Sequence, residues 1–93
     1  MYDTILHQIH ILVLQGNYVF TDHALLEMER DRQIITAEDV ESALLSGRIV
    51  ERQWDIKWHE WKYVVSGATV AGRSMDVVVK VHEHIIIITL YLL

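Results

Sequence analysis

The chain has 93 residues, of which 13 are acidic and eight basic, and a formal net charge of -5. Hydrophobic residues make up 52% of it, enough for one modest core, so we expect a single domain over residues 1–93. There is no cysteine, which excludes disulfides and thiolate zinc sites. No signal-peptide pattern is present, and the longest apolar run, residues 85–93, is too short for a membrane-spanning helix. We therefore expect a soluble, cytoplasmic protein without a membrane partner.

The charge is distributed unevenly along the chain. Residues 1–47 carry two basic side chains, Arg30 and Arg32, against eight acidic ones, whereas residues 48–93 carry six basic against five acidic. A phosphate-binding surface is therefore expected on the carboxy-terminal half.

The first half of the chain has helical periodicity. Residues 3–15 predict a helix that is apolar nearly all round, which requires deep burial or a partner. Residues 18–20 predict a short extended link, and Thr21 is the expected N-cap of a second helix. Thr36 begins a capping-box pattern for a third helix, which Gly47 is expected to end in the left-handed conformation.

The second half changes to β-branched and aromatic residues with two-residue alternation. Strands are predicted at residues 48–55, 60–68, 73–82 and 85–92, and their short links make consecutive strands antiparallel neighbours. The predicted fold is α+β, with two to three N-terminal helices packed on a four-stranded antiparallel sheet. The last strand is apolar on both faces, which indicates either a well-covered strand or an edge that needs a partner chain.

One face of the second predicted helix carries candidate catalytic residues. His23, Glu27 and Arg30 follow one another at spacings of four and three residues. Histidine can move the proton of a ribose 2′-hydroxyl, arginine can neutralise a scissile phosphate, and glutamate can orient the imidazole or act as a second acid or base. Ordinary exposed ion pairs, each worth a few tenths of a kcal/mol, would give the same spacing.

Further candidates lie on the predicted strands. Alternation puts Arg73 and Lys80 on opposite faces of one strand, so a simple shared phosphate-binding patch is disfavoured. Lys80 is expected on solvated sheet surface. For Arg73, a phosphate contact and solvated sheet surface are equally favoured. Tyr91 can position a phosphate, act as an acid, or pack at the rim of the sheet.

Three tryptophans crowd the first predicted hairpin. Trp54, Trp58 and Trp61 can stack unpaired bases or form a protein interface. Because Asp55 and Glu60 are interleaved with them, the interface is the favoured interpretation.

Two histidine pairs have ligand-like spacing. His7 and His10 are one helical turn apart, and His82 and His84 are two residues apart near a strand end. Neither pair has a convincing third ligand, and no glycine-rich phosphate loop or nucleophile elbow is present. We expect neither a metal nor another cofactor.

From residue 20 onward, the order of motifs resembles a bacterial family known as domain of unknown function 4258. The matching stretches are Thr21-Asp-His23-Ala24, Glu27-Met28 with Arg30 or Arg32, Thr36-Ala-Glu-Asp-Val40, Gly47, Gly67, Gly72-Arg73, Val77-Val-Val79 and Ile87-Ile-Thr89-Leu-Tyr91. The resemblance covers the chain except the first predicted helix.

This family is similar to the RelE/BrnT group of toxins, small ribonucleases that cut messenger RNA and are silenced by an antitoxin. The resemblance implies a RelE/BrnT-like fold and the toxin of a type II toxin-antitoxin system, a metal-independent endoribonuclease whose partners are RNA and an antitoxin protein. On this hypothesis His23 is the acid or base, Arg30 and Arg73 bind phosphate, and Glu27 and Tyr91 assist.

A non-catalytic interaction module on the same scaffold is the alternative. The acidic net charge favours it, as do Glu27 and Asp76, which stand where the family commonly has an arginine and a histidine. The alternative predicts a tight partner or a homodimer through Ile11 and Leu14 of the first helix or through the strand at residues 85–93.

Overall fold

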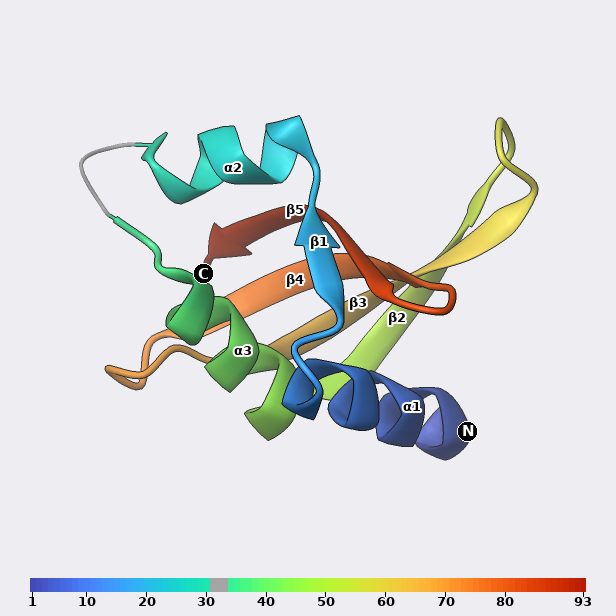
Figure 1. Cartoon of the computed structure of the whole chain (residues 1–93), viewed down its shortest axis with the longest axis horizontal. Coiled ribbons are helices and arrows are strands. Elements are labelled where there is room, and N and C mark those ends of the chain that lie inside the picture. The colour runs from blue at the N-terminus through green and yellow to red at the C-terminus, as the bar shows by residue number, and fades with distance from the viewer. Residues whose placement is uncertain (31–33) are drawn as a thin grey trace.

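Three helices and a five-stranded mixed sheet make up the computed structural model, which describes residues 1–30 and 34–93 (Figure 1). In chain order the elements are α1 (Asp3–Leu14), β1 (Tyr18–Phe20), α2 (Asp22–Met28), α3 (Ala37–Ser46), β2 (Arg48–Asp55), β3 (Glu60–Ala68), β4 (Ser74–Val81) and β5 (Ile85–Leu92). The predicted α+β class is confirmed. Arg32, the alternative to Arg30 in the family motif, lies outside the described residues.

The prediction of four antiparallel strands is wrong because the expected link at residues 18–20 is a fifth strand. β1 pairs in parallel with the first half of β5, with Tyr18 opposite Ile85 and Phe20 opposite Ile87. The strand order is β1-β5-β4-β3-β2, and β2 to β5 are antiparallel neighbours in chain order. Three residues are too few to show an alternation, so only the tertiary pairing identifies this strand.

Threonine caps begin two of the helices, as predicted. The Thr21 side chain accepts a hydrogen bond from the backbone N–H of Ala24 at 3.1 Å. Thr36 and Asp39 form the reciprocal capping box, in which each side chain accepts from the other residue's backbone N–H. These caps satisfy backbone donors that the first helical turn leaves without partners.

The predicted left-handed stop at Gly47 is wrong. This residue ends α3 in extended backbone, with φ -88° and ψ 179°. Glycine is required there for space: a Cβ would lie 2.6 Å from the carbonyl oxygens of both Ala43 and Ser66. The close approach of α3 to β3, not a positive φ, explains the residue.

Helices α1 and α3 lie on one face of the sheet (Figure 1), and the core forms between these helices and the sheet. The buried residues include Ile9, Leu12 and Val13 of α1, Val40, Ala43 and Leu44 of α3, and Val65, Met75, Val77, Val79, Ile85, Ile87 and Leu90 of the sheet. Only one side of α1 is covered, because Ile11 is 42% and Leu14 74% exposed. None of the helices in the described ranges is long and apolar enough to cross a membrane.

Alternation places a second set of side chains on the opposite side of the sheet, which we call the outer face. It is defined by Asp55 of β2, Glu60, Lys62 and Val64 of β3, Asp76, Val78 and Lys80 of β4, and Ile86 of β5. In β5, a bulge opposite Val78 and Val79 leaves Ile88 without a direct partner. The bulge allows Ile87 and Leu90, three residues apart, both to be buried in the core.

Candidate functional site

A buried lysine lies at the centre of a charged cluster on the outer face. The Lys80 ammonium contacts Asp55 Oδ2 and Glu60 Oε1, each at 2.9 Å, and the residue is only 8% exposed. The prediction of solvated sheet surface at Lys80 is therefore wrong. The reason is that the β2–β3 hairpin brings two carboxylates over this strand, a contact that alternation along β4 cannot reveal.

The hairpin turn at residues 56–59 is held by the carboxylate of Asp55. Asp55 and Glu60 are cross-strand partners at its base, and Asp55 Oδ1 accepts the backbone N–H groups of Lys57 at 3.0 Å and Trp58 at 3.2 Å. His59 closes the turn with a positive φ of 52°. Asp55 thus links the backbone of the turn, including that of Trp58, to Lys80.

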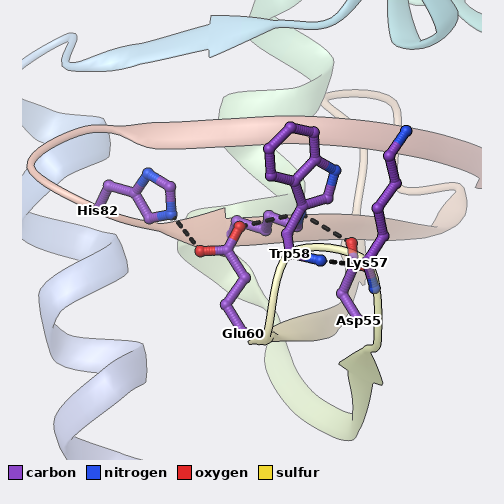
Figure 2. A network of polar contacts seen from close by, with 6 residues as sticks. Asp55, Lys57, Trp58, Glu60 and His82 are labelled. Atoms are coloured by element: carbon purple, nitrogen blue, oxygen red, sulfur yellow. Dashed lines mark hydrogen bonds and ion pairs between the residues drawn. The ribbon is translucent and has the colours of Figure 1, made fainter.

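A histidine–carboxylate pair lies beside the lysine. His82, directly after β4, has its Nε2 2.6 Å from Glu60 Oε2 (Figure 2). Hydrogen bonds from Lys80 and then from His82 lower the pKa of Glu60, so this carboxyl is ionised at neutral pH and can only accept. Nε2 therefore donates, and in the neutral imidazole Nδ1 is the nitrogen left to accept a proton.

A pocket of about 420 Å³ opens at this cluster. Its polar lining consists of Thr21, Asp55, Glu60, Lys62, Lys80 and His82, and its apolar lining of Trp58, Ile86 and Ile88. This volume lies within the range of about 300–1,000 Å³ that is usual for small-molecule sites. A lining that combines charged groups with an aromatic ring and two isoleucines suits a ligand with one polar and one flat, apolar part.

The charges in the cluster support one another. Burial alone would lower the pKa of Lys80, but the hydrogen bonds that its ammonium donates to Asp55 and Glu60 outweigh burial and raise this pKa. The hydrogen bond from Lys80 is the largest cause of the lowered pKa of Asp55. All three groups are therefore charged near neutral pH, and the ammonium is committed to the two carboxylates.

We predict that the cluster contributes to stability at neutral pH and loses this contribution in acid. Asp55 and Glu60 have folded-state pKa values below their ordinary values of about 4, so the unfolded chain binds protons first as the pH falls. In urea unfolding, the stability difference between the native protein and Asp55→Asn/Glu60→Gln should narrow as the pH drops from about 5 to 2. Glu83→Gln, at an exposed turn, is the control; a constant difference for the double variant would contradict the prediction.

The residues predicted as catalytic on α2 lie elsewhere. His23 and Glu27 lie on α2, but Arg30 lies two residues beyond its end, so the three do not share one helix as predicted. Arg30 Nη1 is 3.2 Å from Glu27 Oε1, an exposed ion pair between residues three apart, and His23 is exposed. None of these three lines the pocket at Lys80. Their proposed roles in catalysis stay predictions.

Arg73 and Tyr91 also lie outside the pocket at Lys80. Arg73, just before β4, lines a smaller hollow of about 180 Å³ that includes Ile34 and Leu92. Tyr91 is 45% exposed and is the cross-strand partner of Asp76. Burial, and then the charge of Asp76, raises the pKa of Tyr91, so its hydroxyl keeps its proton at neutral pH.

The structure separates Trp58 from the other two tryptophans, whereas the rings of His82 and His84 stay in contact, with centroids 6.5 Å apart. Trp54 and Trp61 are cross-strand partners whose ring centroids are 5.0 Å apart, whereas Trp58 lines the pocket. Of the sequence pair His82 and His84, the first binds Glu60. In residues 1–30 and 34–93, no three His, Asp or Glu side chains form a group that could hold a metal.

One sequence signal pointed to this site. Lys80 and His82 are two residues apart, which predicts a shared face, and Asp55 and Glu60 flank the first turn. The sequence did not predict that this turn lies over the end of β4.

The fold and the pocket define a class: an α+β protein with a mixed five-stranded sheet and a histidine–carboxylate–lysine cluster on the sheet face opposite two helices. Residues 20–92 match the family model described as Domain of unknown function (DUF4258), and the chain belongs to that family. Helix α1 precedes the matched region. No curated protein and no solved structure matches the chain.

Proposed function

We propose that this protein is the toxin of a type II toxin-antitoxin system, a metal-independent endoribonuclease that acts on messenger RNA in the bacterial cytoplasm. Its scaffold would be RelE/BrnT-like, and its partners would be RNA and an antitoxin protein. The observation that carries the proposal is the 2.6 Å pair of His82 and Glu60 in a pocket that also contains Lys62 and Trp58.

The pair has the arrangement of a general base. Glu60 accepts from Nε2 of His82, which leaves Nδ1 to take the proton of a ribose 2′-hydroxyl. The 2′-oxygen then bonds to phosphorus, the bond from phosphorus to the 5′-oxygen breaks, and that oxygen takes a proton from Lys62. The products are a 2′,3′-cyclic phosphate and a 5′-hydroxyl.

Lysine charge supports the same reaction. Lys62 lines the pocket and can neutralise the phosphate, since it does not share the two carboxylate contacts of Lys80. Lys80 acts as a positioning residue, because its contact with Glu60 holds the carboxylate that orients His82. The reaction would therefore take place on the outer face. His23 on α2 is the competing candidate for the general base, and mutation distinguishes it from His82.

We predict that His82→Ala lowers the rate of RNA cleavage by about 100-fold or more, the usual contribution of a general base. The native protein, purified without antitoxin, is incubated with single-stranded RNA in EDTA, and the ends of the products are identified. His84→Ala and His23→Ala should retain cleavage within about threefold, well below the effect of a general base.

Three results would count against parts of this proposal. Native-rate cleavage by His82→Ala would remove the outer-face mechanism. Loss of cleavage in His23→Ala, with cleavage retained in His82→Ala, would indicate that the general base is His23 on α2. No cleavage by the folded native protein would oppose the ribonuclease proposal in favour of the interaction module.

The interaction module is the second candidate, and exposed apolar side chains favour it. Ile11 and Leu14 of α1, with Leu25 and Leu26 of α2, are between 42% and 74% exposed. A homodimer through the first half of β5 is disfavoured, because β1 and β4 flank that strand on both sides. Sedimentation equilibrium of the native protein and of Leu14→Lys tests whether α1 mediates association.

A further inference from the structure

We propose that Trp58 is a stacking platform for one unpaired nucleobase, so that the pocket takes single-stranded RNA and rejects duplex. This inference rests on the proposed function, because it names the form of RNA that the same pocket binds. Three observations support it: the ordered turn at Trp58, the residues around the Trp58 ring, and the contrast with Trp54 and Trp61.

The Trp58 backbone is held by a well-defined turn, and its ring is exposed. It is 64% exposed although it is large and apolar, and its backbone N–H is bound by Asp55 Oδ1 at 3.2 Å. Asp55 is itself bound to Lys80 at 2.9 Å, and His59 has the positive φ that closes the turn. Because the backbone of the turn is already ordered, only the Trp58 side chain has to lose conformational freedom when a flat ligand binds to its ring.

The surroundings of the ring suit a nucleotide. Trp58 stands over the outer face beside Asp55 and Glu60 (Figure 2), and Ile86 and Ile88 also line the pocket. The Lys57 ammonium lies 5.5 Å from its ring centroid and that of Lys80 5.9 Å. A base can therefore stack on the indole while Lys57 and Lys62 attract the adjoining phosphates.

The other two tryptophans already have ring partners. Trp54 and Trp61 pack edge to face at 5.0 Å, and the Arg52 guanidinium lies 3.9 Å from the Trp61 centroid. They occupy the opposite face of the hairpin, since Trp54 and Trp61 alternate with Asp55 and Glu60. Trp61 is therefore a matched control in the same hairpin.

Stacking on Trp58 requires an unpaired base. Inside a duplex both faces of each base are covered by the neighbouring bases. Trp58 could stack on such a base only after the base had left the helix. A single strand presents such a base at much lower cost. The site is therefore expected to discriminate by strand number more than by sequence.

The test measures binding without cleavage. The probe is a fluorescently labelled oligonucleotide with 2′-fluoro riboses, which lacks the attacking hydroxyl, used as a single strand and as a duplex in anisotropy titrations. Trp58→Ala should weaken single-strand binding by about tenfold or more, whereas Trp58→Phe and Trp61→Ala should bind within about threefold of the native protein. The native protein should bind the duplex at least about tenfold more weakly.

A second readout is specific for stacking. In Trp54→Phe/Trp61→Phe, the only tryptophan left is Trp58, and its fluorescence should be quenched by the single strand but not by an abasic strand of equal length. This measurement decides the matter even if Trp58→Ala fails to fold.

The outcomes separate the two proposals. Native-like binding by folded Trp58→Ala, equal binding of duplex, or equal quenching by the abasic strand would overturn the stacking inference and leave the ribonuclease proposal standing. Failure of the native protein to bind either strand form would overturn both.

Discussion

Gly67→Ala is expected to destabilise the protein by about 3 kcal/mol, the upper part of the range for overpacked cores. A Cβ at Gly67 would lie 2.0 Å from the carbonyl oxygen of Ala43 and 2.8 Å from its carbonyl carbon. Both atoms belong to the backbone of α3, so no rotamer change can relieve the contact. The helix would have to move away from β3 and open the core on both sides.

The control is a glycine whose surroundings are empty. Gly16 has a φ of +68°, and a Cβ there would meet nothing within 4 Å, so Gly16→Ala should cost only the left-handed strain of about 1–2 kcal/mol. Urea unfolding of both variants at neutral pH provides the comparison. A Gly67→Ala variant as stable as Gly16→Ala would show that α3 does not pack this closely on β3.

Lys80→Met is expected to destabilise the protein by about 2–3 kcal/mol. Removing one partner of a buried ion pair typically costs about 3–5 kcal/mol, because the remaining charge is left uncompensated. Here two carboxylates are left, but the Asp55 side chain is 17% and the Glu60 side chain 30% exposed, and water access reduces the cost. Methionine keeps most of the volume of lysine, so the loss reports the charge rather than a cavity.

Removing the carboxylate charges should restore stability. The triple variant Asp55→Asn/Glu60→Gln/Lys80→Met has none of the three charges. The unfolding free energy of this triple variant should exceed that of Lys80→Met by about 1 kcal/mol or more. Circular dichroism during urea unfolding measures both variants against the native protein. If Lys80→Met alone stayed within about 0.5 kcal/mol of native, the change would resemble an ordinary surface substitution and the cluster would not be a stabilising element.

The same cluster joins stability to the proposed chemistry. Lys80 holds Asp55, which supports the turn that presents Trp58, and it holds Glu60, which orients His82. We therefore expect Lys80→Met to weaken both RNA binding and cleavage, although its ammonium is committed to carboxylates.

Local sequence patterns determined the elements of this protein. Helical periodicity and the threonine caps placed α1 and the starts of α2 and α3, and two-residue alternation placed β2 to β5 within about two residues. These features are local, because caps, turns and side-chain alternation depend on residues only a few positions apart. The shared face of Lys80 and His82 followed from the same rule.

The tertiary structure decided the rest. β1 is a strand because its three residues pair with Ile85–Ile87, and Gly47 is a glycine because α3 approaches β3 closely. Lys80 is buried because the β2–β3 hairpin extends two carboxylates over β4. The contacts that join these elements link residues at least 19 positions apart in the chain, as between Gly47 and Ser66, although the Cβ of residue 47 would also meet the carbonyl oxygen of Ala43, four positions away. Local periodicity carries no information about such distances, so the pocket became visible only when the strands were assembled.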